Sequence, residues 1–344
     1  MKKLLFATLL LSLSLASCDI VEFKRAGDSP EENASWGEVS FVLSGDERFV
    51  ATRSKTQAQE SVVNKLQVLV YNSAGNLVAY ASANAGSLSA KVPLKISGHT
   101  VYAVANVSED LSSCSTPNTL DSQISLLERN SLQGLQMIGK LTNQTFTNGE
   151  PVNVEVRRFA SKVEIDEITT DFTAAAYKSQ AFTITGIYLI NVNGSCPFTQ
   201  VATSGTWFNQ MERVSGSCDA LITDQFATPV TVQTSSGDVT PYTTKHYFYC
   251  YANPTTTDAH RGTWSPRRTR LVVETKLGTR TYYYPIDIIG TGGILDLNTA
   301  FTVTRLTITG PGTDHPDDPL DNGAINFTVT VKNWVTGFEK TVEY

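Results

Sequence analysis

The sequence predicts an all-β protein made of two tandem β-sandwich domains, with one short helix in the first domain. Short segments of alternating apolar and polar residues recur along most of the chain, and turns rich in Gly, Ser, Thr, Asn and Pro separate them. Turn signals about every eight to twelve residues are typical of β-sandwiches. The length of 344 residues is enough for two such domains. We place the division near residue 158.

The N-terminal segment is an export signal that ends at a cysteine. Two lysines precede an apolar run from Leu4 to Leu15, which is shorter than the ~20 residues of a membrane-spanning helix. The sequence Leu-Ala-Ser-Cys at 15–18 resembles a bacterial lipobox. We therefore predict a lipoprotein signal peptide over residues 1–17 and lipidation of Cys18, since two or more acyl chains anchor a protein stably. The alternative is an ordinary signal peptide in which Cys18 has no role.

Residues 18–53 are expected to form a lipidated tether and then one strand. The segment up to residue 36 is polar and acidic, which is typical of a flexible tether. The chain then alternates, so that Val39, Phe41 and Leu43 share one face of a strand.

The N-terminal sandwich is predicted over residues 54–158. Two apolar segments flank a turn that contains Gly75 and predict a hairpin. Leu120, Ile124 and Leu127 follow helical spacing after Pro117 and predict a helix at about 119–132. The strands predicted in this domain are 66–71, 77–80, 91–96, 100–107 and 152–156.

The C-terminal sandwich is predicted over residues 159–344. Its last apolar residues alternate with polar ones, and such a terminal strand can complete the sheet of another protein by β-augmentation. The alternative, which the residues alone favour, is that the last strands close their own sandwich. The candidate donor residues are Ile325, Phe327, Val329 and Val331. The predicted strands are 159–165, 181–192, 228–234, 245–251, 269–275, 280–288, 300–309, 324–332 and 338–344.

Composition excludes a nucleic-acid partner. Charged residues make up only 17% of the chain and the net charge is −6, whereas binding to nucleic acid needs a basic face. The basic clusters at 157–158 and 267–270 are short, and we interpret them as charges on edge strands or loops.

Four cysteines remain once Cys18 is assigned to lipid. An exported protein can form disulfides, and four cysteines allow three pairings. Cys196 and Cys218 are the nearest pair and flank a Gly/Ser-rich stretch, so we predict that bridge. The alternative is that all four are free thiols buried in the β core.

Catalytic motifs are absent from the sequence. It contains no zinc-protease, nucleophile-elbow or phosphate-loop pattern, so we expect neither an enzyme nor a cofactor. A weak candidate for a hard cation such as calcium is the loop that contains Asp314, Asp317 and Asp318. EF-hand spacing is missing and two prolines stiffen the loop, so we prefer to interpret it as an exposed acidic loop.

Two tryptophans support an alternative function. Trp207 and Trp264 could offer aromatic faces to sugars, which would make the chain a surface-anchored glycan-binding β-sandwich lipoprotein. Aromatic residues more often pack in the core.

Several segments, taken in order, resemble the fimbrillin family, the pilins of type V pili. The resemblance covers most of the chain beyond Cys18 and depends on order and spacing more than on any single segment. The segments are ATRS (51–54), ESVVNKLQVLVY (60–71), TVYAVANV (100–107), RFASKV (158–163), YYYPI (282–286), LNT (297–299), ITGPGTD (308–314) and VTVKNW (329–334).

The resemblance implies transthyretin-like sandwiches and a mechanism of assembly. The pilin would reach the outer membrane as a lipoprotein, and an arginine-specific protease would cut after Arg53, with Arg48 as second choice. Cleavage would release residues 18–53 together with the strand at 38–43. Unpaired strand edges demand a replacement, and the C-terminal strand of another subunit would supply it. Such a head-to-tail contact does not close on itself and builds a filament.

The function implied by the resemblance is that of a structural subunit of a surface fimbria that contributes to adhesion. The expected partners are other pilin subunits in a homo- or heteropolymer, the arginine-specific protease, the outer membrane through the lipid, and a host or bacterial surface ligand. Stalk, tip and anchor roles stay open at this point.

Overall fold

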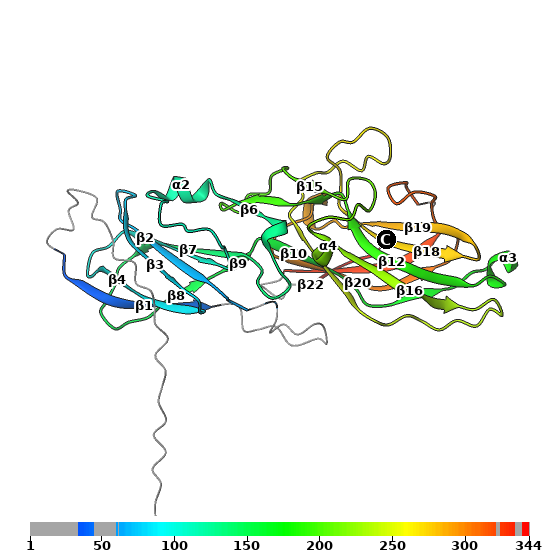
Figure 1. The fold of residues 1–344 in the computed structure, drawn as a ribbon, viewed down its shortest axis with the longest axis horizontal. Helices are drawn as coiled ribbons and strands as arrows, with labels where there is room; N and C mark the ends of the chain where they lie inside the picture. The colour runs from blue at the N-terminus through cyan, green and yellow to red at the C-terminus, as the bar shows by residue number, and fades with distance from the viewer. Residues whose placement is uncertain (1–33, 45–59, 61, 321–323, 334–338, 344) are drawn as a thin grey trace, which may run out of the picture.

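The structure, a computed structural model, describes residues 34–44, 60, 62–320, 324–333 and 339–343, with the backbone alone for 326–333 and 339–343. Two β-sandwiches lie end to end and give an elongated molecule (Figure 1). The expected all-β fold class is confirmed, because strands dominate the described residues. Their α-helices are α2 (Pro117–Asp121), α3 (Ala175–Lys178) and α4 (Asp219–Ile222).

Two sheets form the N-terminal sandwich. Five strands in the order β3-β2-β5-β7-β9 face three strands in the order β4-β1-β8. Alternate apolar side chains from both sheets make a separate core that includes Val39, Phe41, Leu66 and Val68. The strand bounds are β1 (Trp36–Ser44), β2 (Leu66–Tyr71), β3 (Leu77–Ala83), β4 (Ser87–Pro93), β5 (His99–Ala105), β7 (Met137–Gln144), β8 (Val152–Glu155) and β9 (Arg157–Arg158).

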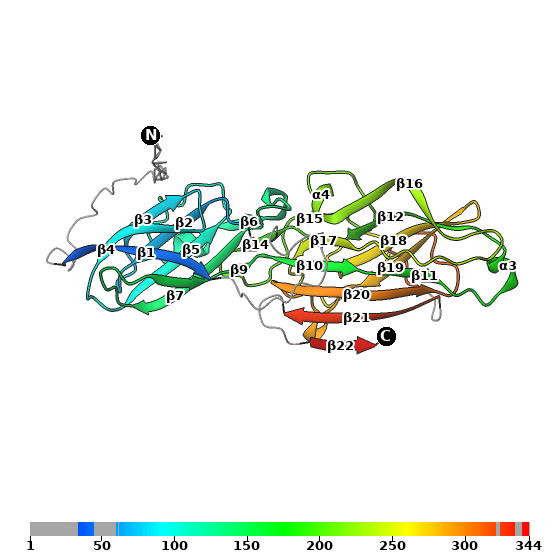
Figure 2. The same cartoon turned by 90° about the horizontal axis from the view of Figure 1, so that it is seen from below.

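Two further sheets form the C-terminal sandwich. One has the order β17-β10-β20-β21-β22, with β11 also paired to β20, and the other has the order β16-β12-β18-β19. Figure 2 shows β21 and β22 at the outer edge of the first sheet. The bounds are β10 (Ala160–Ile165), β11 (Ile168–Thr170), β12 (Phe182–Ile190), β16 (Thr223–Gln233), β17 (His246–Tyr251), β18 (Arg270–Leu277), β19 (Arg280–Asp287), β20 (Thr299–Ile308), β21 (Ile325–Asn333) and β22 (Glu339–Glu343).

The two sandwiches are joined by a shared core and a small ladder. The C-terminal core continues into the N-terminal domain through Leu127, which lies outside the sheets, and through Tyr102 and other side chains of the five-stranded sheet. Strand β6 (Ile124–Leu126) of the first domain pairs antiparallel with β14 (Ser195–Pro197) of the second. Asn130 donates to the Tyr251 hydroxyl at 2.8 Å across the same junction. These contacts therefore join the two domains directly.

The expected helix over 119–132 is wrong beyond Asp121. Helix α2 is capped by Thr116 and ends at Asp121, and the chain then enters β6 and a 3-10 turn, η2 (Leu127–Arg129). Leu120 and Leu127 are both buried, but from different elements. Pairing with β14 overrides the local helical spacing, because spacing alone carries no information about a distant partner.

Short elements complete the path of the chain. They are β13 (Val192–Asn193), which pairs with β15 (Trp207–Phe208), and the 3-10 turn η3 (Thr291–Gly293). In the part of the chain that the structure describes, no helix has both the length and the apolar character needed to cross a membrane.

Candidate functional site

Strand β1 holds the three-stranded sheet of the N-terminal domain together. It pairs antiparallel with β4, where Phe41 lies opposite Leu88, and parallel with β8, where Phe41 lies opposite Val152. Among the described strands, β4 and β8 have no other ladder within this sheet, so β1 is the link between them. The first strand in the sequence is therefore central in its sheet.

The side chains of β1 fill the core. Val39 and Phe41 are fully buried, and Leu43 packs against the same cluster. The Phe41 ring meets Phe146 edge to face, with centroids 6.0 Å apart. Burying one such side chain is worth about 1.5–3 kcal/mol. The strand is held by the core as well as by two ladders.

Loss of β1 would open a slot with defined walls. Both flanking strands would present unpaired backbone groups, and the floor would be the apolar face of the five-stranded sheet, including Val68, Val70 and Val101. Strand β8, one wall of the slot, can approach β7 closely because Gly139 in β7 has no side chain. A β-carbon at this position would lie 2.1 Å from the Glu155 carbonyl oxygen. Such a slot is unstable in water unless another strand fills it.

Glu60 anchors the chain downstream of the polar segment. Its carboxylate accepts from the Tyr249 hydroxyl at 2.7 Å and lies 3.0 Å from the Lys162 ammonium, both in the C-terminal domain. Its backbone carbonyl accepts from the Arg158 guanidinium. Glu60 is 3% exposed, and burial together with the nearby Glu60 carboxylate raises the pKa of Tyr249. Sequence reasoning did not identify this anchor.

The candidate donor strand lies in its own sheet. β21 pairs along β20, with Ile325 opposite Ile308 and Phe327 opposite Leu306. Those two partners on β20 are fully buried. β22 then covers the outer edge of β21. The strands predicted as donors thus pair within the C-terminal sandwich of their own chain.

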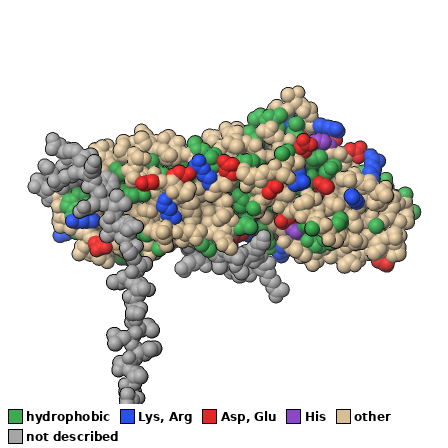
Figure 3. Space-filling model, in the orientation of Figure 1, with side chains coloured by type: hydrophobic (Ala, Val, Ile, Leu, Met, Phe, Trp, Pro, Cys, Tyr) green, Lys and Arg blue, Asp and Glu red, His purple; other side chains and the backbone are tan. Residues whose placement is uncertain are grey.

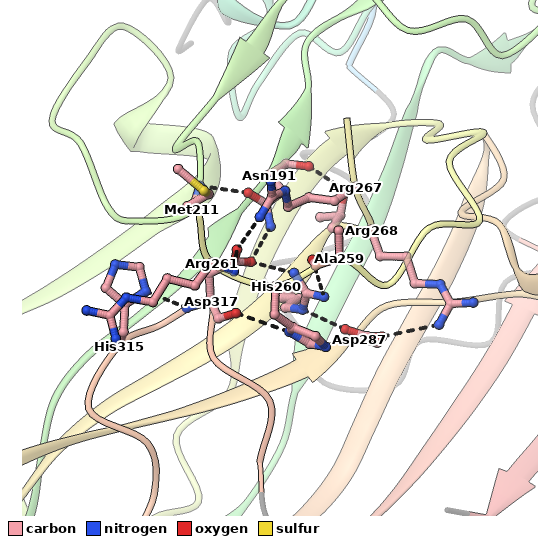
Figure 4. Close-up of polar contacts among 12 residues, drawn as sticks. Asn191, Met211, Ala259, His260, Arg261, Arg267, Arg268, Asp287, His315 and Asp317 are labelled. Atoms are coloured by element: carbon pink, nitrogen blue, oxygen red, sulfur yellow. Dashed lines mark hydrogen bonds and ion pairs between the residues drawn. The ribbon is translucent and has the colours of Figure 1, made fainter. Parts of the chain in front are cut away.

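The carboxylates of the acidic loop take part in an ion-pair network. Asp317 is fully buried and its carboxylate accepts from Asn191, Arg267, Arg270 and the backbone N–H of Arg261. Figure 4 shows Asn191, Arg261 and Arg267 around Asp317. Arg267 and Arg270 are each 1% exposed. Arg267 lies in a loop, as we expected, but Arg270 begins β18, an inner strand of its sheet, so the interpretation as an edge or loop charge was wrong for Arg270.

The other two candidate ligands are also occupied by arginine. Asp314 accepts from Arg280 at 2.8 Å, and Asp318 accepts from Arg261 at 3.1 Å. In the described residues no three His, Cys, Asp or Glu side chains gather as a metal site would require. The preferred interpretation as an exposed acidic loop fails at Asp317, whose arginine partners lie about fifty positions away in sequence.

The two tryptophans pack on each other. The Trp207 and Trp264 rings meet edge to face, with centroids 5.5 Å apart, and the Arg267 guanidinium lies over Trp264. A sugar platform needs an open ring face, and both side chains are only partly exposed. The arrangement therefore favours packing over glycan binding.

The four cysteines are buried free thiols in the structure, and the expected bridge between Cys196 and Cys218 is not formed in it. Both thiols lie near the Tyr251 hydroxyl. Burial raises the pKa of each of these two thiols to about 12, which keeps them in the unreactive thiol form.

The remaining predicted positions are Cys18, Arg48 and Arg53, which lie outside the described residues. On the face drawn in Figure 3, basic and acidic side chains are interspersed. That face carries no basic patch of the kind that nucleic acid requires.

Comparison with known proteins identifies relatives of this architecture. Residues 38–181 match the sequence model of the family described as "Major fimbrial subunit protein (FimA)". No curated protein sequence matches the chain. The family match begins within β1 and ends at the residue before β12.

Solved structures share the fold over both domains. A candidate cell adhesion protein from Bacteroides eggerthii has a TM-score of 0.64 at 17% identity, covering 88% of this chain and 98% of its own. A fimbrilin (FimA) from Porphyromonas gingivalis has a TM-score of 0.60 at 15% identity, with coverage of 88% and 98%. A fimbrial assembly protein from Parabacteroides distasonis has a TM-score of 0.51 at 13% identity, with coverage of 90% and 99%.

These findings confirm the resemblance to the fimbrillin family. The sequence match covers residues 38–181, and the likeness of fold covers both sandwiches. The matched family consists of fimbrial structural subunits, which agrees with the prediction of a structural protein and not an enzyme.

Proposed function

We propose that the chain is a structural subunit of a surface fimbria that is processed by a protease and assembled by β-strand exchange. The observation that carries the proposal is the central place of β1, which links β4 to β8 and precedes the arginine-containing segment 45–59. The fimbrial family match supports the same role. Each copy would fill the β1 position of the next.

Cleavage after Arg53 converts β1 from part of the chain into a bound peptide. Upstream of the cut, Val39 and Phe41 hold the fragment in the core. Downstream, Glu60 keeps the remaining chain attached to the C-terminal domain. The cut thus allows β1 to leave while the two domains stay joined. Arg48 is the second candidate for the cut.

The C-terminal strands are the proposed donor. They lie at the outer edge of their sheet, beyond β20, so that among the described strands their departure breaks only the ladder between β20 and β21. An extended strand that enters the slot regains main-chain hydrogen bonds on both sides. The donor assignment covers Ile325, Phe327, Val329 and Val331.

Before cleavage, the proposed location is the outer membrane. The lipobox-like sequence before Cys18 supports acylation of that residue, and removal of residues 18–53 would free the subunit from its anchor. Lipidation is tested by incorporation of labelled palmitate, which we expect in the native protein and not in Cys18→Ser.

The processing step is tested with purified lipid-free protein that begins at Asp19. An arginine-specific protease is added, the new N-terminus is sequenced, and an unboiled denaturing gel is run. We expect a cut after Arg53 and a ladder of detergent-resistant multimers.

Arg53→Ala is the test variant and Arg48→Ala is its matched control. The first should abolish both the cut and the ladder, whereas the second should leave both unchanged. A clean cut after Arg53 that leaves only monomer would contradict assembly by strand exchange.

A further inference from the structure

The residue pattern of β1 recurs at the beginning of β21. Residues 37–43 read Gly-Glu-Val-Ser-Phe-Val-Leu, and residues 323–329 read Gly-Ala-Ile-Asn-Phe-Thr-Val. The glycine, the β-branched residue, the phenylalanine and the last aliphatic residue have the same spacing and the same chain direction. The two segments lie 286 positions apart in the sequence, in different domains.

Each of these positions in β1 has a structural requirement. A β-carbon at Gly37 would lie 2.6 Å from Leu94 Cδ1 and 2.7 Å from Asn148 Oδ1, so a side chain there would displace both neighbours. Val39 and Phe41 fill closed positions in the core, and Leu43 packs at its margin. A replacement strand must therefore have glycine at the position of Gly37. At the positions of Val39, Phe41 and Leu43 it must have a β-branched residue, an aromatic residue and an aliphatic residue.

The intervening positions face outward and accept polar residues. In β1 these are Glu38, Ser40 and Val42, which are exposed or half-buried. At the same places the C-terminal segment has Ala324, Asn326 and Thr328. Because successive strand residues point to opposite faces, a shift of one residue would turn the apolar row away from the core. A shift of two would place Ile325 or Val329 in the aromatic position.

We propose that a second copy of this chain fills the slot in a single register, with Ile325, Phe327 and Val329 in the places of Val39, Phe41 and Leu43. The inference rests on the strand exchange proposed above and adds to it the register in which the donor strand is aligned. Phe327 takes the position against Phe146, and the donor runs antiparallel to β4 and parallel to β8, as β1 does.

The fold places the start of the donor strand at the end of the molecule that can face the N-terminal domain of the next copy. Figure 2 shows that β21 begins at the pole of the C-terminal domain that faces away from the N-terminal domain. The loop before it is fixed by Asp317 and by Leu320, which packs on the core. The strand can therefore extend outward from a fixed base to the N-terminal domain of the next copy.

The register is tested by cysteine cross-linking within the assembled polymer. Ser40 lies opposite Ser89 of β4, so the inference pairs Asn326 of one copy with Ser89 of the next. The variant S89C/N326C is cleaved and assembled alone, oxidised, boiled and run without reductant. We expect a disulfide-linked ladder that collapses to monomer with reductant, and a linked peptide joining residues 89 and 326.

Two matched variants report a register shifted by two residues. Ser87 and Lys91 lie opposite Val42 and Glu38 and are exposed. S87C/N326C and K91C/N326C should assemble normally but fail to form the covalent ladder. Cross-linking through either of these pairs, in place of residue 89, would overturn the register and leave strand exchange intact.

The unboiled gel separates this inference from the proposed function. Multimers in all three variants show that strand exchange occurs, whatever the register. Multimers that form only after a different pilin is supplied would overturn the assignment of a second copy as partner. An absence of multimers after complete cleavage would overturn strand exchange itself and the register with it.

Discussion

Asp317 balances the charge of two buried arginines in the C-terminal domain. Two guanidinium groups, each 1% exposed, share its carboxylate, and Asp287 provides the other carboxylate, 2.8 Å from Arg270 Nε. Removing one partner of a buried ion pair leaves an uncompensated charge in a medium of low polarity. The sequence shows only acids in a loop, because Arg267 and Arg270 lie far away in the chain.

At the residue scale, Asp317→Asn should therefore lower the free energy of unfolding by about 3–5 kcal/mol. The matched control is Asp314→Asn, whose partner Arg280 is well exposed, and such a surface pair contributes about 0–1 kcal/mol. Urea denaturation of both variants measures the difference. Equal losses in the two variants would contradict the central role of Asp317.

Asp296 makes stability depend on pH. Burial raises the pKa of its carboxyl above the ordinary value of 3.8, so folding disfavours its charged form. The resulting cost is absent below pH 3.8 and appears as the pH rises through the raised pKa. Asp296→Asn should thus melt at a higher temperature than wild type at pH 7, and the gap should close at pH 3. A gap that widens toward low pH would contradict this assignment.

At the scale of elements, alternation located most strands because half-buried strands carry a period of two. Strand β7 was missed, since Met137–Gln144 contains Gly139 and ends in polar residues. Gly139 lets β8 approach β7 closely, and this requirement comes from packing between strands and not from the local sequence pattern. The apolar row of β1 was predicted from sequence, but its central place between β4 and β8 depends on pairing that local pattern does not encode.

The side chains of β1 should affect the stability of the uncleaved precursor but not that of the polymer. Phe41→Ala should destabilise the uncleaved protein by about 3–5 kcal/mol, because it leaves a cavity against Phe146. After cleavage, the same variant should form multimers as heat-resistant as those of wild type, since β1 has left. Ser40→Ala, at a half-buried outward position, should stay within about 0.5 kcal/mol in both states.

Thermal melting of the precursor and heating of the multimers on unboiled gels compare these two states. Multimers that are weakened by Phe41→Ala as much as the precursor would show that β1 remains in place. That result would contradict its displacement.

At the scale of the whole molecule, the junction couples the domains. The β6–β14 ladder, the bond from Asn130 to Tyr251 and the Glu60 anchor all cross it. None of these contacts follows from local pattern, because each joins residues distant in sequence. In the proposed filament, force between subunits would pass through these contacts.

Glu60→Ala should weaken this junction. It removes the carboxylate that accepts from the buried Tyr249 hydroxyl and that lies beside the Lys162 ammonium, at a cost of about 1–3 kcal/mol. Faster hydrogen exchange is expected in β10 and β17, and not for the exposed control Glu150→Ala. Unchanged exchange in both strands would contradict the anchor.

The central claim is that the C-terminal strand of one copy replaces β1 of another. The direct test mixes two variants that cannot polymerise alone. The recipient is cleaved and lacks residues 324–344, and thermal melting first confirms that it is folded. The donor carries Arg48→Ala and Arg53→Ala, so its own slot stays filled.

Light scattering of the mixture decides the claim. We predict a 1:1 dimer that resists denaturing detergent without boiling and grows no further, because each component supplies one half of the contact. A folded recipient that stays monomeric with excess donor, or a mixture that forms longer chains, would contradict strand replacement.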